Sequence, residues 1–505
     1  MRTLVVMGHP RTQSLCAAIA DAYSRGAVDA GCEVRSLALA DMDFDLNVNF
    51  PTPHLQPDEP DLIAARAAVH WADHIVFIYP TWWGTMPALL KGFVDRIFIS
   101  GFSFVETEGG TGYEPLLRGK TAQLITTMDT PGFVYNLVYH APGKNALAKA
   151  TLGFCGYTMV APLVFRTVRH SSPQQRAQWL EHAYAKGQAL QNGVLSPGRK
   201  LLIKTGYWLK ALRLQFYPMT FIAYSVGALL AEFAGYGWNT SFFWLGYAWI
   251  FFAEVLTVFA NEYLDQKSDD HNNYYGPFNG GSRVLTTGEI SRVSMRNAIV
   301  LISFITLVLL GTLLLQPATM NTASITASLT LLIIAIGYTV PPLKLSYRGL
   351  GELTVGVTHS AAVVLCGFLY QGGAVADPGP WLLSLPLFLS VLPSIILAGV
   401  PDLIADAAAG KRTIAVRVGP KIAAQLALFF TVAAVGTTLI YAWLNILPAI
   451  LNNMLFFVVP HACWLGWMLT RYFSKPPSAG RIDALIIAAL TFLVWFAIVP
   501  LINLL

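Results

Sequence analysis

The second part of the chain consists of long runs of apolar residues separated by short polar stretches. Crossing the hydrocarbon core of a bilayer takes about 20 apolar residues in a helix. Because every backbone polar group must be satisfied inside lipid, such runs predict membrane-spanning helices. We expect nine spans, at 215–234, 241–260, 297–316, 321–339, 353–371, 380–400, 422–444, 447–470 and 482–504.

Basic residues mark one side of this expected bundle. Alternate junctions hold Lys267, Arg283, Arg292, Arg296, Lys344, Arg348, Lys411, Arg412, Arg417, Lys421, Arg471, Lys475 and Arg481, and the opposite junctions hold no lysine or arginine. The positive-inside rule places the basic side in the cytosol. We therefore expect an integral, multi-pass protein of a bacterial-type inner membrane, with a cytosolic N-terminal domain and its C-terminus on the opposite side. The net charge of +5 then reflects topology, and no nucleic-acid partner is expected.

Residues 1–195 have the charge frequency of a soluble domain. Apolar, β-rich runs at 4–7, 74–79, 121–127 and 157–165 alternate with stretches at 14–30 and 86–97 that can form helices. This alternation predicts an α/β fold with a doubly wound parallel sheet. The five cysteines are far apart and form no CxxC pair, which favours a reducing, cytosolic setting over zinc sites or disulfides.

Two loops of this domain suit a flat, phosphate-bearing ligand. The loop GHPRTQS at 8–14 lacks the G-x-G-x-x-G fingerprint of dinucleotide binding. Its small polar residues suit a phosphate at a helix N-terminus, or equally a plain helix cap. Trp82 and Trp83 follow the strand at 74–79, and doubly wound folds bind ligands at the carboxyl ends of their strands. They are either core residues or a stacking wall for a flat ring.

Residues 8–15, 79–98, 116–127 and 153–157 resemble the flavodoxin-like NAD(P)H:quinone oxidoreductases, over about residues 2–190. The resemblance implies a flavodoxin-like fold, bound FAD (or FMN), NAD(P)H as electron donor and a homodimer through this domain. The residues that it places against the flavin are His9, Ser14, Pro80, Thr81, Trp82, Trp83, Thr126 and Thr127. It places Tyr135 and His140 at the quinone and nicotinamide pocket. The family follows its paired threonines with two glycines, whereas this chain has Met128 and Asp129.

Oxygen-bearing side chains gather near the cytosolic ends of two expected spans. Asn261, Asp265 and Asp269 recur every four residues and so share one helix face, and Asp402 and Asp406 do the same. Each carboxylate at membrane depth costs a few kcal/mol, so two such clusters need compensating charge. Mg²⁺ bridging a diphosphate supplies it, since this ion combines few carboxylates with phosphate oxygens. Basic residues that could bind the remaining phosphate charge are Lys344, Arg348, Lys411 and Arg412.

Three further polar residues lie within expected spans. Glu254 stands seven residues before Asn261 on the same helix face. It could accept a proton or bind a ring hydroxyl in a cavity, or serve as a structural carboxylate between helices. His359 and His461 are predicted to be helix-packing residues.

The motifs NExxDxxxD (261–269) and DxxxDxxxGKRT (402–413), with residues 276–291 and 338–352, resemble the UbiA superfamily of intramembrane prenyltransferases. The likeness spans about residues 205–505. It implies an all-α bundle of nine transmembrane helices, in which Asn261, Asp265, Asp269, Asp402 and Asp406 hold Mg²⁺ and a polyprenyl diphosphate. Tyr338 and Lys344 match an element beside the diphosphate, and Arg283 matches a loop arginine. The implied reaction is prenyl transfer to an aromatic ring.

These interpretations combine into a fusion of a reductase domain (1–195), a basic and aromatic interfacial linker (196–218) and a prenyltransferase domain (219–505). A quinone is electron-poor, whereas its hydroquinone can attack an allylic carbocation. The reductase would therefore prepare the acceptor in menaquinone or ubiquinone biosynthesis. One alternative is an acceptor that is already reduced, such as dihydroxynaphthoate, with the flavin domain recycling quinones separately. Another is a transporter with a regulatory reductase domain.

Overall fold

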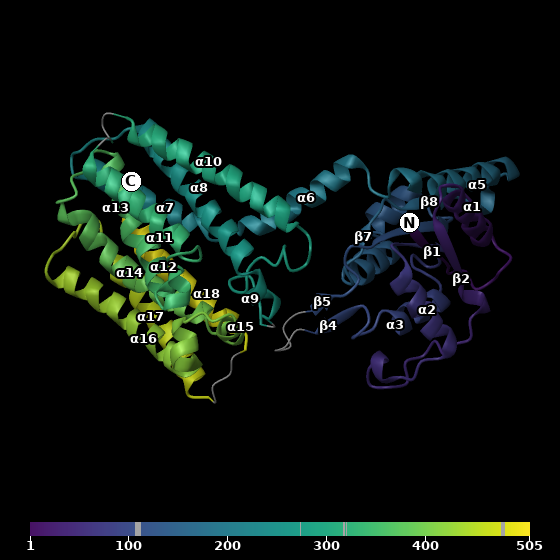
Figure 1. Cartoon of the computed structure of the whole chain (residues 1–505). Coiled ribbons are helices and arrows are strands. Elements are labelled where there is room, and N and C mark those ends of the chain that lie inside the picture. Colours follow the sequence, from purple (N-terminus) through teal and green to yellow (C-terminus); the bar gives the residue numbers. More distant parts are fainter. Residues whose placement is uncertain (107–112, 273, 317–318, 320, 476–479) are drawn as a thin grey trace. The chain divides into compact units, whose positions relative to one another are not determined.

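The computed structural model describes residues 1–106, 113–272, 274–316, 319, 321–475 and 480–505 (Figure 1). The chain divides into two compact units, Met1–Leu201 and Leu202–Leu505.

A parallel sheet forms the centre of the first unit. Its strands are β1 (Arg2–Met7), β2 (Glu33–Ala38), β3 (His74–Pro80), β6 (Thr121–Met128), β7 (Thr158–Met159) and β8 (Leu163–Arg166). The spatial order is β2-β1-β3-β6-β7, with β8 also paired to β6, and every pairing in this sheet is parallel. This confirms the doubly wound α/β fold expected from the sequence.

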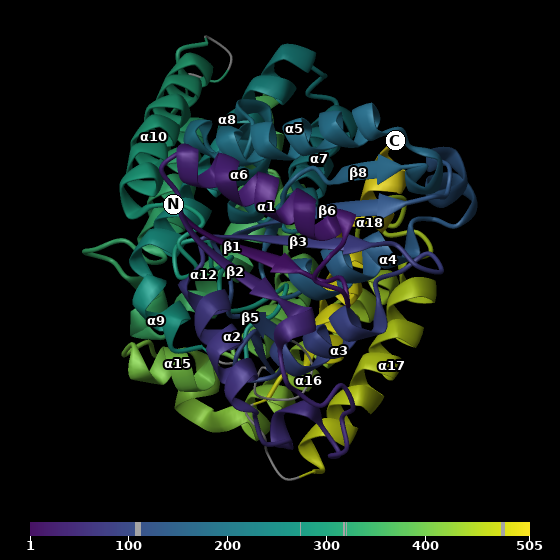
Figure 2. The ribbon, with the colours of Figure 1, turned by 90° about the vertical axis from the view of Figure 1, so that its right-hand side faces the viewer.

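Helices cover both faces of this sheet (Figure 2). On one face α1 (Leu15–Asp29) packs against α5 (Pro173–Gln188), and on the other lie α2 (Pro60–Trp71) and α3 (Ala88–Ile97). Strand β3 is buried over its whole length, because a central parallel strand is covered from both sides. The unit also contains the short helix α4 (Pro142–Asn145) and an antiparallel hairpin of β4 (Phe104–Glu106) and β5 (Tyr113–Pro115).

The run 157–165, expected as one strand, forms the two short strands β7 and β8. Strand β7 pairs with the start of β6 and β8 with its end. Pro162 lies between them and has no N–H to donate to a strand ladder, which accounts for the interruption.

The second unit is built from helices. Their bounds are α6 (Pro197–Leu212, which begins before the unit boundary), α7 (Tyr217–Phe233), α8 (Thr240–Leu264), α9 (Gln266–Asp270), α10 (Arg292–Leu314), α11 (Thr322–Gly337), α12 (Gly351–Val357), α13 (Val363–Tyr370), α14 (Pro378–Ala398), α15 (Leu403–Ala408), α16 (Ile414–Trp443), α17 (Met454–Phe473) and α18 (Asp483–Leu504). Helix α7 approaches α13 closely, because Gly227 and Gly367 face the partner helix. A Cβ on Gly227 would lie 2.0 Å from the carbonyl oxygen of Val364.

Among the described residues, six helical segments are long and apolar enough to cross a membrane. There are seven if α6 and α7, which meet at 55°, form one bent span. The expected number was nine. Helices do occupy all nine expected stretches, but α11 and α17 fall outside this set, and α7 enters it only together with α6. The several apolar helices indicate an integral, multi-pass membrane protein.

Candidate functional site

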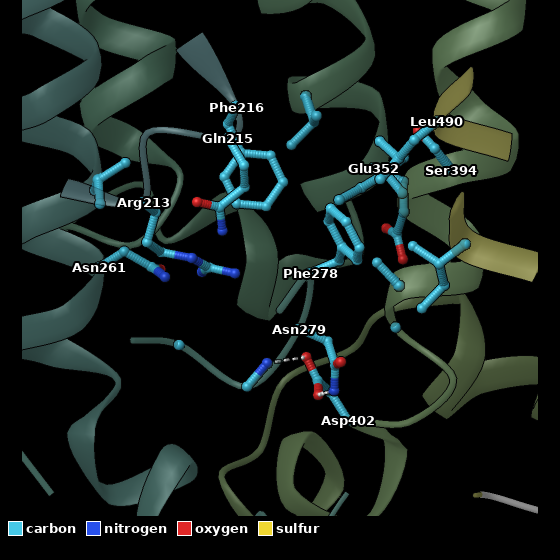
Figure 3. A pocket seen from close by; sticks show the side chains of 18 of the residues that line it. Arg213, Gln215, Phe216, Asn261, Phe278, Asn279, Glu352, Ser394, Asp402 and Leu490 are labelled. Atoms are coloured by element: carbon cyan, nitrogen blue, oxygen red, sulfur yellow. Dashed lines mark hydrogen bonds between the residues drawn. The ribbon is translucent and has the colours of Figure 1, made fainter. Parts of the chain in front are cut away.

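A cavity of about 640 Å³ lies among the helices of the second unit (Figure 3). The predicted site residues that line it are Glu254, Asn261, Asp265, Asp269, Tyr338, Asp402, Asp406 and Lys411. The structure therefore brings the two acid-bearing segments to one cavity, although more than a hundred residues separate them in the chain. Apolar side chains from α14 and α18, among them Val391, Ile395, Leu490 and Val494, line it as well.

The four-residue spacing predicted that the first acid motif lies on one continuous helix, but the structure shows a break within it. Helix α8 ends at Leu264, Asp265 is its C-cap, and Asp269 lies on the short helix α9. Asp265 is 2% exposed, and its Oδ1 accepts a hydrogen bond of 2.8 Å from the Tyr347 hydroxyl. The helix is thus interrupted within the motif, yet both Asp265 and Asp269 line the cavity.

The second acid motif begins where α14 has already ended. Asp402 is the N-cap of α15, and Asp406 lies within that helix. Asp402 Oδ1 accepts hydrogen bonds from the side-chain amides of Asn272 (2.7 Å) and Asn279 (2.8 Å), and its Oδ2 accepts one from the Gly280 N–H. Figure 3 shows Asn279 and Asp402 facing each other. The loop after α9 thus ties the two acid motifs together.

Lys411 neutralises both motifs at once. Its Nζ lies 2.7 Å from Asp265 Oδ2 and 3.2 Å from Asp406 Oδ1. Burial lowers the pKa of Lys411, but the Asp265 and Asp406 carboxylates raise it further, so the ammonium stays charged. Burial, reinforced by the Glu262 carboxylate, raises the pKa of Asp269 to about 8. Burial also raises the pKa of Asp406 to about 6, although Lys411 opposes the shift. The positive charge of one lysine is therefore too small to balance these closely spaced carboxylates.

The donor set fits magnesium held together with a substrate. In the part of the chain that the structure describes, no three His, Cys, Asp or Glu side chains are close enough to hold a metal ion by themselves. Mg²⁺ usually takes one or two carboxylates and completes its shell with phosphate oxygens and water. Asp265, Asp269, Asp402 and Asp406 offer hard oxygen ligands around one cavity, with space between them for such a ligand.

Four predicted phosphate-binding residues lie outside the cavity lining. Arg283 donates from its guanidinium to the carbonyl oxygens of Asp269 and Asn272, so it fixes the end of α9. Arg348 donates to the Pro342 carbonyl, and Lys344 Nζ lies 4.8 Å from the centre of the Tyr347 ring. Arg412 is exposed.

The sequence reasoning missed Arg213 as a cavity residue. It lies in the break between α6 and α7 with a positive φ of 54°, and it lines the cavity. Its guanidinium carbon is 4.8 Å from the centre of the Phe216 ring, and no hydrogen bond or ion pair joins the guanidinium to a described residue. Figure 3 shows it among the side chains that line the cavity. The basic composition of residues 196–218 was the available signal, which was interpreted as a membrane anchor.

The remaining polar residues of the helices, Glu262, His359 and His461, differ in their surroundings. Glu262 is buried and faces Ser282, whose hydroxyl donates to its Oε2 at 2.8 Å. His461 accepts from Trp495 Nε1 at 3.0 Å and lies outside the cavity lining, as expected of a packing residue. His359, also expected to be a packing residue, instead lines the cavity beside Glu254.

In the first unit, the predicted flavin-contacting residues gather at the carboxyl ends of β1, β3 and β6. Ser14 caps α1, with its Oγ accepting from the Ala17 N–H. His9 is buried, burial lowers its pKa, and its ring lies edge-on to Trp82 at 5.6 Å. The predicted residues on the two neighbouring strand ends are Pro80, Thr81, Trp82, Trp83, Thr126 and Thr127. Thr81 N–H donates to the Thr127 carbonyl, which joins those ends.

The two tryptophans are exposed rather than core residues. Trp82 is 46% exposed, and Trp83 is fully exposed with a positive φ of 51°. The turn that carries them closes through hydrogen bonds between the backbones of Trp82 and Thr85. A fully exposed tryptophan ring in a turn with a positive φ is unusual on the surface of a domain. Both are therefore placed to meet a ligand or a partner surface.

Tyr135 and His140 lie on the segment that follows β6. The Tyr135 hydroxyl donates to the Gly84 carbonyl and accepts from the Lys144 N–H. Tyr135 and Thr126 line a cavity of about 200 Å³, whereas His140 is exposed with a φ of 56°. At the two positions that depart from the family pattern, Met128 pairs with Arg166 in the sheet, and Asp129 Oδ1 accepts from the Arg169 N–H.

Comparison with known proteins agrees with this division. Residues 1–190 match a family model described as flavodoxin-like fold, and residues 219–485 match the UbiA prenyltransferase family. A ribosyldihydronicotinamide dehydrogenase-like protein of Penicillium crustosum is 30% identical over 153 residues, 25% of this chain and 57% of that protein. NAD(P)H dehydrogenase [quinone] 1 of Rattus norvegicus is 30% identical over 128 residues, 24% of this chain and 45% of that protein. The chain spans about half the length of the curated relatives that it matches.

Among solved structures, a UbiA homolog from Archaeoglobus fulgidus bound to GPP and Mg²⁺ aligns with 57% of this chain and 99% of its own, at 16% identity and a TM-score of 0.42. The fold and the site define a membrane protein with an acid-lined cavity in a helical bundle and a flavodoxin-like domain before it. The UbiA model covers more than half of the chain, and the chain belongs to the UbiA prenyltransferase family.

Proposed function

We propose that the protein reduces a naphthoquinone-like quinone with NAD(P)H in its first unit and transfers a prenyl group to the resulting hydroquinone in its second. The meeting of Asp265, Asp402 and Lys411 at one cavity carries this proposal. An intramembrane cavity that combines buried acids with apolar walls suits a ligand with a diphosphate head and a long isoprenoid tail.

In the second unit, the chain's own residues bind, orient and exclude water. Asn261, Asp265, Asp269, Asp402 and Asp406 are the proposed ligands of Mg²⁺, which when bound neutralises the departing diphosphate. Lys411 and Arg213 supply further positive charge at that end, and Tyr338 lies beside it. The apolar walls from α14 and α18 hold the isoprenoid and keep water from the allylic cation.

In the first unit, the carboxyl edge of the sheet fits a flavin. A flavin when bound supplies the two-electron transfer. The helix N-terminus capped by Ser14 attracts phosphate, and the exposed rings of Trp82 and Trp83 offer faces for stacking. Tyr135, held by the Gly84 carbonyl and the Lys144 N–H, borders the proposed quinone pocket.

The linker would keep the two activities together. Helix α6 carries lysines and Trp208, the composition of a membrane-interface segment, and we propose that it lies there on the cytosolic side. Tethering raises the local concentration of hydroquinone at the second site. A homodimer through the reductase domain stays a prediction.

The decisive experiment uses the purified full chain with NAD(P)H, Mg²⁺, a prenyl diphosphate and a quinone. The expected product is the prenylated hydroquinone, identified by mass spectrometry. A Trp83→Ala variant shown to be free of flavin should form none, and quinone reduced beforehand with dithionite should restore its activity. Equal yield from that flavin-free variant without added reductant contradicts the coupling. Asp265→Ala should lower prenyl transfer by about 100-fold or more in both settings.

A further inference from the structure

One wall of the cavity carries two neighbouring groups that can accept hydrogen bonds, Glu254 and His359. Glu254 on α8 faces His359 in the π-helical turn Thr358–Ala362, with 3.9 Å between Glu254 Oε1 and His359 Nε2. That separation is too long for a direct hydrogen bond. Glu254 Oε2 is buried and has no hydrogen-bond partner among the described residues.

The tautomer of His359 follows from its other ring nitrogen. Nδ1 lies 3.1 Å from the Val355 carbonyl oxygen, which can only accept, and 3.1 Å from Thr358 Oγ1, whose proton is already donated to the Thr354 carbonyl, so Nδ1 carries the proton. Nε2 is then a second acceptor beside the carboxylate. Glu254 Oε2 is buried without a hydrogen-bond partner, which is costly because it has lost its hydrogen bonds to water, whereas His359 Nε2 belongs to a side chain that is 31% exposed and lines the cavity. Both side chains line the cavity, so the pair can accept a hydrogen bond from a ligand there.

The position of the pair separates it from the diphosphate end. Glu254 precedes Asn261 by seven residues on the same helix, which corresponds to about 10 Å along its axis. The cavity lining also includes apolar side chains, among them Met219, Ile222, Val355 and Ile395. Lys411, by contrast, is engaged with Asp265 and Asp406 at the acid end.

We propose that Glu254 and His359 bind a hydroxyl group of the aromatic acceptor, and that this acceptor is an uncharged ring such as a hydroquinone. The assignment rests on the proposed prenyl transfer and decides between its two acceptor classes. A ring with a free carboxylate would bring a negative charge beside the Glu254 carboxyl group, away from the basic residues of the cavity, which is unfavourable. A hydroxyl donates to the pair and adds no charge.

The same contact gives the transferred protons a path. When the allylic carbon–oxygen bond breaks, its electron pair leaves with the diphosphate, and a ring carbon supplies the pair for the new carbon–carbon bond. The donor hydroxyl becomes a carbonyl, and its proton passes to Glu254 or His359. The substituted ring carbon then loses its hydrogen as a proton, and the carbonyl is protonated back to a hydroxyl. One proton is released for each prenyl group transferred.

The test uses the full chain in lipid nanodiscs with Mg²⁺ and geranylgeranyl diphosphate. We expect 2-methyl-1,4-naphthohydroquinone to show a lower KM than 1,4-dihydroxy-2-naphthoate. In Glu254→Gln and His359→Phe, the KM for the hydroquinone should rise about tenfold or more. Binding of an unreactive prenyl thiodiphosphate with Mg²⁺ should stay unchanged in both variants, because the pair is remote from the acid end.

Ser394→Ala is the matched control, since Ser394 lines the same cavity but its hydroxyl already donates to the Val391 carbonyl. A hydroquinone KM in both pair variants equal to that of Ser394→Ala would overturn the assignment. So would a parent chain that prefers the carboxylate-bearing acceptor. Failure of the parent chain to bind the thiodiphosphate contradicts the proposed prenyl transfer itself, which sets the two failures apart.

Discussion

At the acid end of the cavity, one lysine joins carboxylates from two separate segments. Lys411 lies between Asp265 and Asp406, which come from segments that only the tertiary fold joins. A buried lysine between two carboxylates stabilises both, and its removal leaves their charge uncompensated. The same lysine is within reach of whatever anion enters, so its two roles cannot be separated by removing it. A substitution at a glycine near the acids tests their position and leaves this lysine in place.

Gly281 is such a position. Its φ is +69°, and a Cβ there would lie 2.2 Å from Asp269 Oδ2. Gly288 has the same φ with open space around it, so Gly288→Ala carries the conformational strain alone. We expect Gly281→Ala to displace Asp269 and lower prenyl transfer on the order of 100-fold, as misplacement by about 1 Å can do. Product formation by both variants, with unfolding temperatures, checks this; equal activities would count against it.

His74 predicts how the stability of the reductase unit depends on pH. It is fully buried, and burial lowers its pKa to about 4 from an ordinary value of 6.5. Below 6.5 the unfolded chain takes up a proton that the folded chain refuses, so stability falls as pH drops from 6.5 toward 4. The slope is about 1.4 kcal/mol for each pH unit. Hydrogen exchange of β1 and β3 amides in the full chain measures it. His74→Gln should flatten this dependence, and an unchanged slope would contradict the assignment.

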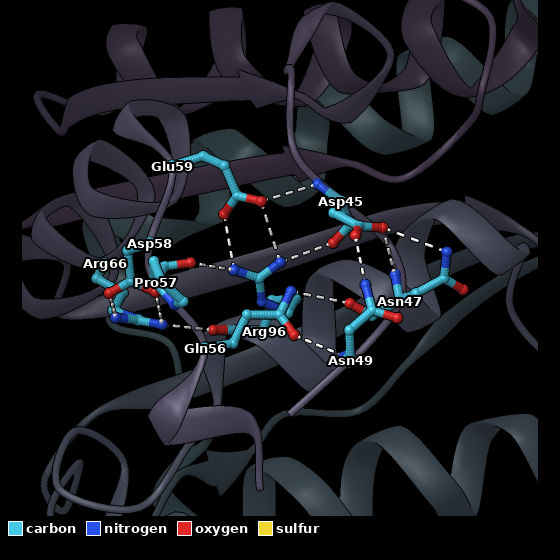
Figure 4. Close-up of polar contacts among 9 residues, drawn as sticks. All are labelled: Asp45, Asn47, Asn49, Gln56, Pro57, Asp58, Glu59, Arg66 and Arg96. Carbon is cyan, nitrogen blue, oxygen red and sulfur yellow. Dashed lines mark hydrogen bonds and ion pairs between the residues drawn. The ribbon is translucent and has the colours of Figure 1, made fainter. Parts of the chain in front are cut away.

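Among the elements, a buried arginine organises the loop before α2. Arg96 on α3 is fully buried and donates to the carbonyls of Asp45 and Pro57 and to the Glu59 carboxylate (Figure 4). Arg66 joins the network through Asp58 and the Arg96 carbonyl. The loop has little regular structure of its own, so these bonds fix its path.

Removing Arg96 should therefore be costly. We expect Arg96→Met to destabilise the reductase unit by about 3–5 kcal/mol, because the Glu59 carboxylate loses its buried partner. Lys91→Met on the same helix breaks the exposed pair with Asp95 and should cost less than about 1 kcal/mol. The midpoint of flavin release on heating compares the two variants. Similar midpoints would show that the network contributes little.

Helices and strands were predicted best where a single physical effect determines the pattern of apolar residues. Strand β3 was found because burial on both faces leaves a continuous apolar run, and the apolar helices were found because a membrane span needs about 20 apolar residues. The edge strand β2, with its exposed polar residues, gave no such pattern. The break at Asp265 was missed because spacing describes an ideal helix and not where it ends. Arg213 and His359 were missed because cavity lining depends on how distant helices pack.

At the scale of the whole molecule, the proposed advantage of the fusion is the tether between its two units. Expressing residues 1–195 and 196–505 as separate chains should leave quinone reduction and prenyl transfer to added hydroquinone unchanged. Prenyl transfer from limiting quinone should fall about tenfold or more, since the local concentration provided by the linker is lost. Initial rates at several quinone concentrations measure this. Equal rates for joined and separate chains at limiting quinone would contradict it.

The position of Arg213 bears on how such a protein can be rebuilt. The family match begins at residue 219, so this cavity arginine precedes the recognised catalytic portion and is carried by the connecting segment. A graft that exchanges the N-terminal partner at the apparent family boundary would discard it along with the linker. Chimeras that preserve the transferase cavity should therefore be joined upstream of α6, and natural recombination that succeeded would be under the same restriction.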